Sequence, residues 1–157
     1  MNVMNRLLRA ACAFPLLLAA CASPPHPVPD DPRWLTYVGG DGPGRGKHIV
    51  LVAAEQEYRS EQSMPMLAKV LATHHGFHCT VLFAQHDGLV DPTQKTAQED
   101  KSIVHDIPGL EHLANADLLI LFSRFMTLPP TQLAHITDYL DSGKPIFALR
   151  TANHGFL

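Results

Sequence analysis

The sequence has little cysteine and no excess of positive charge, and each shortage excludes a class of protein. Three cysteines in 157 residues are too few for a disulfide-rich scaffold. The 12 Lys and Arg against 15 Asp and Glu give a formal net charge of −3, so the basic surface typical of nucleic-acid binding is missing. Internal repeats are absent, as are H-E-x-x-H and C-x-x-C motifs, which leaves no familiar metal-ligand spacing. The 46% of hydrophobic residues suit one ordinary globular domain.

The first 20 residues have the pattern of an export signal. Arg6 and Arg9 form a basic start, and the apolar run after them is too short to span a bilayer core of about 30 Å as a permanent helix. The run ends in Leu-Ala-Ala-Cys at residues 18–21, which resembles the lipobox of bacterial lipoproteins. That resemblance implies lipidation of Cys21 and, because Ala22 follows, anchoring at the periplasmic face of the outer membrane. The alternative is a plain secretory signal with an incidental cysteine.

Residues 21–46 are expected to be a tether and a lead-in to the folded domain. The proline-rich stretch 22–31 favours an extended, semi-rigid chain. The glycine-rich stretch 39–46 lacks the Lys-Ser/Thr ending of a phosphate loop, so a flexible lead-in is expected there. Trp34 and Tyr37 lie between these stretches and are expected to pack on the edge of the domain.

Strands and helices alternate through residues 47–157, the expected domain. Aliphatic runs predict strands at 48–54, 77–84, 118–122 and 145–149; the first is predicted to be buried on both faces, and 118–122 is also predicted to be buried. Helical spacing predicts one helix from Ser63 to Gly76, a short one at 110–114 and a third from Pro129 to Gly143. This alternation favours an α/β fold with a doubly wound parallel sheet. The long polar stretch 85–108 is expected to be a functional or mobile loop.

Polar side chains gather where the predicted strands end, although the strands themselves carry almost no charge. Each of the four predicted strands is followed by a polar segment: residues 55–61 (EQEYRSE), 85–87 (QHD), 123–125 (SRF) and 150–154 (RTANH). The carboxyl ends of parallel strands meet at one edge of a sheet, where ligands of this fold class bind. The sequence therefore predicts a polar binding site at that edge.

Most of the chain after the tether resembles a known family, over segments 39–84, 107–125 and 136–156. The most specific matches are residues 57–61 (EYRSE), 123–125 (SRF) and 149–151 (LRT). They resemble the ThuA-like (trehalose utilisation-like) domain family, and more closely its exported bacterial lipoprotein branch. The resemblance implies a fold similar to class I glutamine amidotransferases, within the flavodoxin-like group, and a role in sugar or keto-sugar metabolism. Amidotransferases carry a nucleophilic cysteine in the turn that matches residues 149–154, and none stands here. Glutamine hydrolysis is therefore excluded as far as the resemblance holds.

The resemblance also implies roles for the residues at the strand ends, without a metal or a cofactor. The candidate catalytic residues are Glu57, Arg124, Arg150 and His154. The candidate ligand-binding residues are Glu55, Tyr58, Arg59 and Thr151.

These candidates also have purely structural interpretations. Arg124 and Arg150 could pair with nearby carboxylates and simply join loops. Glu57 could interact with the positive end of the following helix. His74, His75 and His78 flank a turn, but no further ligand completes a metal set, so structural histidines are expected; Cys79 is expected to be a buried small apolar residue.

Three functional hypotheses follow from the sequence. The first is an enzyme that acts on a sugar or an oxidised sugar by acid–base chemistry. The second is a module that binds a saccharide without turnover. The third is an inactive remnant of a longer protein, because similar proteins continue past the strand at 145–149; a sheet incomplete at its C-terminal end would need a partner chain or a dimer to complete it. The expected partners are thus a carbohydrate, a membrane and possible further chains, but no nucleic acid.

Overall fold

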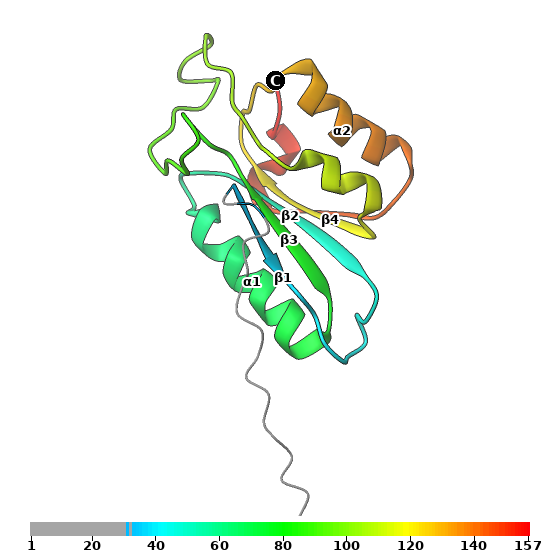
Figure 1. The fold of residues 1–157 in the computed structure, drawn as a ribbon. Helices are drawn as coiled ribbons and strands as arrows, with labels where there is room; N and C mark the ends of the chain where they lie inside the picture. The colour runs from blue at the N-terminus through cyan, green and yellow to red at the C-terminus, as the bar shows by residue number, and fades with distance from the viewer. Residues whose placement is uncertain (1–30, 32) are drawn as a thin grey trace, which may run out of the picture.

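The computed structural model describes Asp31 and residues 33–157, which form one sheet with helices packed on it (Figure 1). The strands are β1 (Trp34–Tyr37), β2 (His48–Ala54), β3 (His78–Phe83), β4 (Leu118–Ser123) and β5 (Ile146–Ala148). The helices are α1 (Ser60–His75) and α2 (Pro130–Asp141), and η1 (Leu110–Asn115) and η2 (Arg150–His154) are 3₁₀ helices. In this part of the chain no helix has the length and apolar character needed to cross a membrane.

The strand order of the sheet is β1-β3-β2-β4-β5. β2 pairs in parallel with β3 and β4, and β4 pairs in parallel with β5, which confirms the expected α/β class and is consistent with a flavodoxin-like arrangement. The expectation of a purely parallel sheet was wrong at one edge, because β1 pairs antiparallel with β3. The burial of Trp34 and Tyr37 on opposite faces of the sheet holds this short strand in place.

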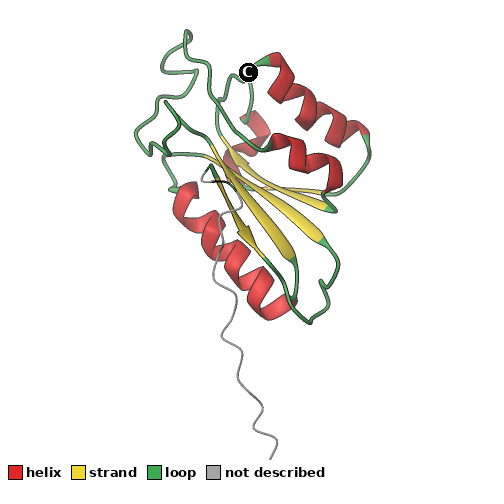
Figure 2. Cartoon of the chain, viewed as in Figure 1, coloured by secondary structure: helices red, strands yellow, loops and turns green. Residues whose placement is uncertain are grey.

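The sheet separates two apolar layers because successive side chains of a strand point to opposite faces. Val50 and Val52 of β2 belong to the cluster that contains Ile136 of α2. Leu51 belongs to the cluster that contains Met64 of α1. Figure 2 shows α1 on one face of the sheet, with η1 and α2 on the other. Each fully buried aliphatic side chain contributes about 1.5–3 kcal/mol, so both helices are held mainly by these layers.

Helix α1 begins at Ser60, earlier than the predicted cap at Ser63. The hydroxyl of Ser60 accepts a hydrogen bond from the N–H of Glu55 (2.9 Å), and the Ser60 N–H donates to the Glu55 carbonyl (3.0 Å). These reciprocal bonds fix the first helical residue to the end of β2, so the helix starts there. It ends as predicted at Gly76, whose φ of 77° lies in a region that residues with a Cβ rarely adopt.

The glycine-rich stretch 39–46 packs against the turn between α1 and β3, where a flexible lead-in was expected. The N–H of Gly44 donates to the carbonyl of His75 (2.8 Å). A Cβ on Gly39 would lie 2.3 Å from the carbonyl oxygen of Gly76, so the close approach of these backbones requires glycine. The stretch therefore connects β1 to β2 as a packed turn.

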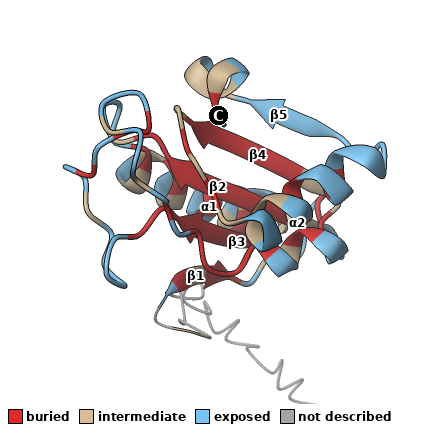
Figure 3. Cartoon of the chain, turned by 90° about the horizontal axis from the view of Figure 1, so that it is seen from above, coloured by how far each residue is buried: buried red, intermediate tan, exposed pale blue. Residues whose placement is uncertain are grey.

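β5 differs from the other parallel strands because both of its faces are exposed (Figure 3). Five of the six residues of β4 are buried, whereas all three residues of β5 are exposed, with Phe147 at 56%. One side of β5 pairs with β4, and the other side pairs with no strand among the described residues. This edge exposes apolar side chains, those of Ile146 and Phe147.

Cys79 lies in β3 and is fully buried, as predicted. Burial raises the pKa of its thiol to about 12, so it behaves as a small apolar side chain. The predicted signal at residues 1–20, the lipidation of Cys21 and the tether up to residue 30 lie outside the described residues.

Candidate functional site

β2 and β4 are neighbours in the sheet, and the helices that follow them pack on opposite faces. The ends of these two strands therefore border the point where the winding of the chain reverses. In doubly wound sheets this point opens a crevice in which ligands bind. Residues 55–59 follow β2 and residues 124–125 follow β4, so both groups of predicted site residues lie there.

Glu55, directly after β2, has a fully buried carboxylate, with a side-chain exposure of 0%. Its Oε2 accepts a hydrogen bond from the Thr151 hydroxyl (2.6 Å), and its Oε1 accepts one from the backbone N–H of Glu57 (3.0 Å). The guanidinium of Arg124 lies 3.9 Å from Oε1. Burying a carboxylate costs several kcal/mol unless such partners compensate. Glu55 is thus a fixed support that ties the ends of β2, β4 and β5 together.

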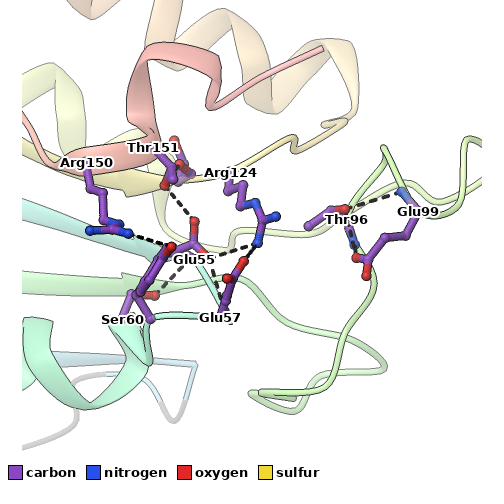
Figure 4. Close-up of polar contacts among 10 residues, drawn as sticks. Glu55, Glu57, Ser60, Thr96, Glu99, Arg124, Arg150 and Thr151 are labelled. Carbon is purple, nitrogen blue, oxygen red and sulfur yellow. Dashed lines mark hydrogen bonds and ion pairs between the residues drawn. The ribbon is translucent and has the colours of Figure 1, made fainter.

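Glu57 carries the exposed carboxylate of the site, and Arg124 Nη1 donates to its Oε2 (Figure 4). The Glu57 side chain is 52% exposed and that of Arg124 is 28% exposed. Arg124 therefore links a buried carboxylate, Glu55, to one that a ligand can reach. A carboxylate in this position can accept a hydrogen bond or a proton from a hydroxyl, while the guanidinium donates.

η2 brings two more predicted residues to the same edge. The Thr151 hydroxyl lies 2.6 Å from Glu55 Oε2 and 3.0 Å from the Ser123 carbonyl, so it joins β2 to β4. Arg150 donates to the Tyr58 hydroxyl (2.6 Å), and its guanidinium carbon lies 3.8 Å from the centre of the Tyr58 ring. A cation over an aromatic ring adds about 0.5–1 kcal/mol at an exposed site. Tyr58 and Arg150 form a second polar pair at the same edge of the sheet.

Two predicted site residues have their contacts elsewhere. Arg59 pairs with Glu61 in the first turn of α1, with 2.5 Å between Nε and Oε1. His154 stacks on Phe125, with ring centroids 4.5 Å apart. Within the described residues, neither side chain forms a hydrogen bond or an ion pair with Glu57. Arg59 and His154 therefore do not belong to the hydrogen-bonded cluster around Glu55.

The backbone at this edge is strained at four positions. Arg59, Asp87, Phe125 and Arg150 have φ angles of 56°, 50°, 45° and 45°. A residue with a Cβ is less stable in the left-handed region by about 1–2 kcal/mol, although aspartate tolerates it better than most. These residues follow β2, β3, β4 and β5 in turn, so the strain is concentrated where the polar side chains gather. Such a concentration is typical of functional sites.

The long loop 85–108 covers one side of these strand ends and is anchored by a buried histidine. His105 is 1% exposed; its Nδ1 accepts the N–H of Thr127 (3.0 Å), and its Nε2 donates to the carbonyl of Lys95 (2.9 Å). Farther along, the Glu99 carboxylate accepts both the N–H and the hydroxyl of Thr96, each at 2.8 Å (Figure 4). These bonds lower the pKa of Glu99. The part of the loop beside Glu57 is therefore an ordered turn.

A cavity of about 320 Å³ lies between this loop and the strand ends, and we call it the crevice. Its lining consists of Gln56, Glu57, Arg124, loop residues 92–96 and Glu99. Small-molecule sites in proteins range from about 300 to 1,000 Å³. The crevice is thus large enough for a small ligand and brings the Glu57–Arg124 pair to its wall.

Sequence reasoning did not select several polar residues that complete this site. Thr96-Ala-Gln-Glu99 has the S/T-x-x-E spacing of a capping box, which could have marked the turn in the loop. Gln56 and Gln94 gave no such signal, because glutamine is common in polar loops. In the described part of the chain, both amide atoms of Gln56 and Oε1 of Gln94 are buried and lack a hydrogen-bond partner. Each such atom destabilises the fold by about 1–3 kcal/mol.

Metal-ligating groups are scarce in the same region. Among Asp31 and residues 33–157, no three or more His, Cys, Asp or Glu side chains are placed to hold a metal ion. What the crevice offers a ligand is hydrogen-bonding amides, hydroxyls and paired charges.

The chain matches no family model, no curated protein and no solved structure.

Proposed function

We propose that this chain is a ThuA-like α/β domain that binds a carbohydrate at the carboxyl edge of its sheet and acts on it by acid–base chemistry. The observation that carries this proposal is the buried carboxylate of Glu55, which holds Arg124 and the Glu57 turn at the wall of the crevice. Buried charges with specific partners in a cleft mark functional sites. The segments that resemble the family, 57–61, 123–125 and 149–151, all follow or end strands at this edge.

We infer further that the sheet is wound as in the class I glutamine amidotransferase-like members of the flavodoxin-like group. Counted from β2, the parallel strands have the order 2-1-3-4. That order is the beginning of the flavodoxin-like order 2-1-3-4-5, in which the ligand lies at the switch point between the first and third strands. Those strands are β2 and β4, which present Glu55, Glu57 and Arg124.

In the proposed reaction Glu57 is the base. Its exposed carboxylate accepts the proton of a ligand hydroxyl, and Arg124 orients that carboxylate and donates to the ligand oxygen beside it. Thr151 acts through Glu55 as a positioning residue. Arg150 and Tyr58 lie at the same edge outside the lining of the crevice, so they supply donors to a ligand that extends beyond it. Residues 149–154 contain no cysteine, so the proposed chemistry has no thiol nucleophile.

The test is Glu57→Gln, which keeps the shape of the side chain and removes its basicity. Calorimetry with a panel of neutral mono- and disaccharides, including glucose and trehalose, measures binding, and NMR of the sugar follows turnover. We expect Glu57→Gln to abolish turnover and to change affinity by less than about tenfold. Glu61→Gln is the matched control, because Glu61 pairs with Arg59 outside the cluster. A protein that binds none of these sugars, and no charged sugar either, contradicts the proposal.

A second candidate is a saccharide-binding module without turnover. It is supported by the engagement of the Glu57 carboxylate by Arg124 and by the stacking of His154 on Phe125. In that case Glu57→Gln weakens binding, and no sugar is converted by either protein.

We also propose that the domain is exported and lipid-anchored through Cys21, and that a further chain adds to the sheet at β5. The first proposal is supported by the residue pattern 18–21, and the second by the exposure of Ile146 and Phe147. Intact mass of the protein extracted from its native membranes tests the anchor. The expected product begins at residue 21 and carries three acyl chains, and a mass without lipid contradicts the anchor.

A further inference from the structure

Two glutamines on opposite sides of the crevice have amide atoms that nothing in the described part of the chain satisfies. Gln56 belongs to the turn after β2, and Gln94 belongs to the long loop. Gln94 is 7% exposed; its Nε2 donates to the carbonyl of Gln85 (3.3 Å), and its Oε1 has no donor. For Gln56 both Nε2 and Oε1 are without a partner. Folded proteins leave few buried polar atoms unpaired, so three of them beside one cavity point to a ligand.

The charges that line the crevice compensate one another. Glu57 is paired with Arg124, and Glu99 is occupied by the N–H and the hydroxyl of Thr96. Lys95 and Arg124 carry two positive charges against the two negative charges of Glu57 and Glu99. Arg124 also lies 3.9 Å from the buried Glu55, so its charge is already shared between two carboxylates. The lining therefore carries no net positive charge that would attract an acidic ligand, and the buried Glu55 adds a negative charge behind Arg124.

The chemistry of an amide indicates what the ligand carries. The NH₂ group donates two hydrogen bonds, and the oxygen accepts. A hydroxyl both donates and accepts, so a ligand with several hydroxyls can satisfy both glutamines at once. The volume of about 320 Å³ is at the small end of ligand sites, which favours a molecule the size of a monosaccharide.

We propose that the crevice selects an uncharged, hydroxyl-rich ligand over its acidic or phosphorylated counterparts, and that Gln56 and Gln94 determine this specificity by hydrogen bonding its hydroxyls. The proposal rests on the proposed function, because it names the class of carbohydrate that the same site takes. It adds two residues to the site, one of them on the long loop.

The experiment compares neutral sugars with charged ones on the unsubstituted protein. Calorimetric titrations use glucose, galactose and mannose, then glucuronate, galacturonate and glucose 6-phosphate. The expected result is that at least one neutral sugar binds at least about tenfold more tightly than its charged counterparts. Equal or tighter binding of a charged sugar overturns the specificity and leaves the proposed carbohydrate function standing. Binding of no sugar at all overturns both.

Variants then assign the specificity to the two amides. Gln56→Met and Gln94→Met keep the length of the side chain and remove its hydrogen-bonding groups. Each is expected to weaken binding of the preferred neutral sugar by about tenfold, with the circular dichroism spectrum unchanged. Gln62→Met, on the exposed surface of α1, is the matched control and is expected to bind as the unsubstituted protein does. Unchanged affinity in both crevice variants overturns the role of the glutamines.

Discussion

At the two edges of the sheet, different types of residue adopt a positive φ in the turns. At the amino edge, where the chain enters the strands, glycines do so: Gly46 before β2 and Gly76 before β3 both have a φ of 77°. At the carboxyl edge four residues with side chains do so, Arg59, Asp87, Phe125 and Arg150, together with Gly88 in the long loop. Glycine adopts this conformation without a clash, whereas a side chain makes it strained. The difference indicates that the amino edge only turns the chain, while the carboxyl edge also presents side chains.

The two edges also differ in whether their polar groups have hydrogen-bond partners. At the amino edge Asp117 accepts the N–H of His48 and the ammonium of Lys47, each at 2.9 Å, and His48 Nε2 lies 2.9 Å from the Thr80 hydroxyl. These groups satisfy one another. At the carboxyl edge the amide of Gln56 is unpaired beside a cavity. Polar residues at strand ends are therefore not enough to mark a site, and unsatisfied groups beside a cavity are the distinguishing feature.

The largest effect on stability is expected at the carboxyl edge, for Glu55→Ala. The substitution leaves the Glu57 N–H without its acceptor, leaves the Thr151 hydroxyl only the Ser123 carbonyl, and removes one of the two carboxylates near Arg124. We expect the free energy of unfolding to fall by about 2–4 kcal/mol, measured by urea denaturation.

The control for that substitution is Glu57→Ala, which removes an exposed carboxylate from the same turn. Its expected effect is about 0–1 kcal/mol, because solvent screens an exposed ion pair. Similar losses for the two variants would mean that the burial of Glu55 has no special structural role.

The amino edge is expected to control the pH dependence of stability through His48. Burial, with His78 and His112 nearby, lowers the pKa of His48 to about 4. Between pH 6.5 and pH 4 the unfolded chain binds a proton at this histidine that the folded chain does not bind, so stability falls as the pH falls. His48→Gln should reduce that fall by about 1–2 kcal/mol, allowing for the partial exposure of the ring. Thermal melts of both proteins from pH 7 to pH 4 measure this loss of stability. Parallel stability profiles for the two proteins would contradict the role of His48.

A smaller effect tests the strain at Arg150. Arg150→Gly and Arg150→Ala both remove the contact with Tyr58, so their difference reports the backbone alone. The glycine variant should be more stable by about 0.5–1 kcal/mol, because its φ of 45° no longer clashes with a Cβ. Chemical denaturation compares the two proteins. An alanine variant of equal or greater stability would show that this turn relaxes freely.

The strands that could be predicted are those with continuous aliphatic sequence. β2 was predicted at its observed bounds, and β3 and β4 to within a residue or so at each end, because such runs favour strands in the interior of a sheet. β1 was missed because Trp34–Tyr37 is short and is stabilised by β3, which lies far along the chain. The start of α1 was missed because the bonds between Ser60 and Glu55 depend on how the chain leaves β2.

The sequence predicted that the candidate residues gather at one edge, but it did not predict their contacts. Glu55, Glu57, Arg124 and Thr151 follow strands in the sequence and were given roles by the family resemblance, and the structure brings them together. Burial separates their roles, since Glu55 is enclosed and Glu57 is exposed, and sequence position does not encode that distinction. The contribution of the long loop was also hidden, because its packing depends on bonds such as those of His105.

Whether the carboxyl edge is the ligand site is tested most directly by NMR of the ¹⁵N-labelled protein titrated with the neutral sugars. Ligand binding should shift the amide signals of residues 55–60, 92–99, 123–125 and 150–151, and the side-chain amides of Gln56 and Gln94. The signals of residues 44–48, 76–78 and 112–117 at the amino edge should stay in place. Shifts confined to the amino edge or to β5, or no shifts with any sugar, would contradict a ligand site at the carboxyl edge.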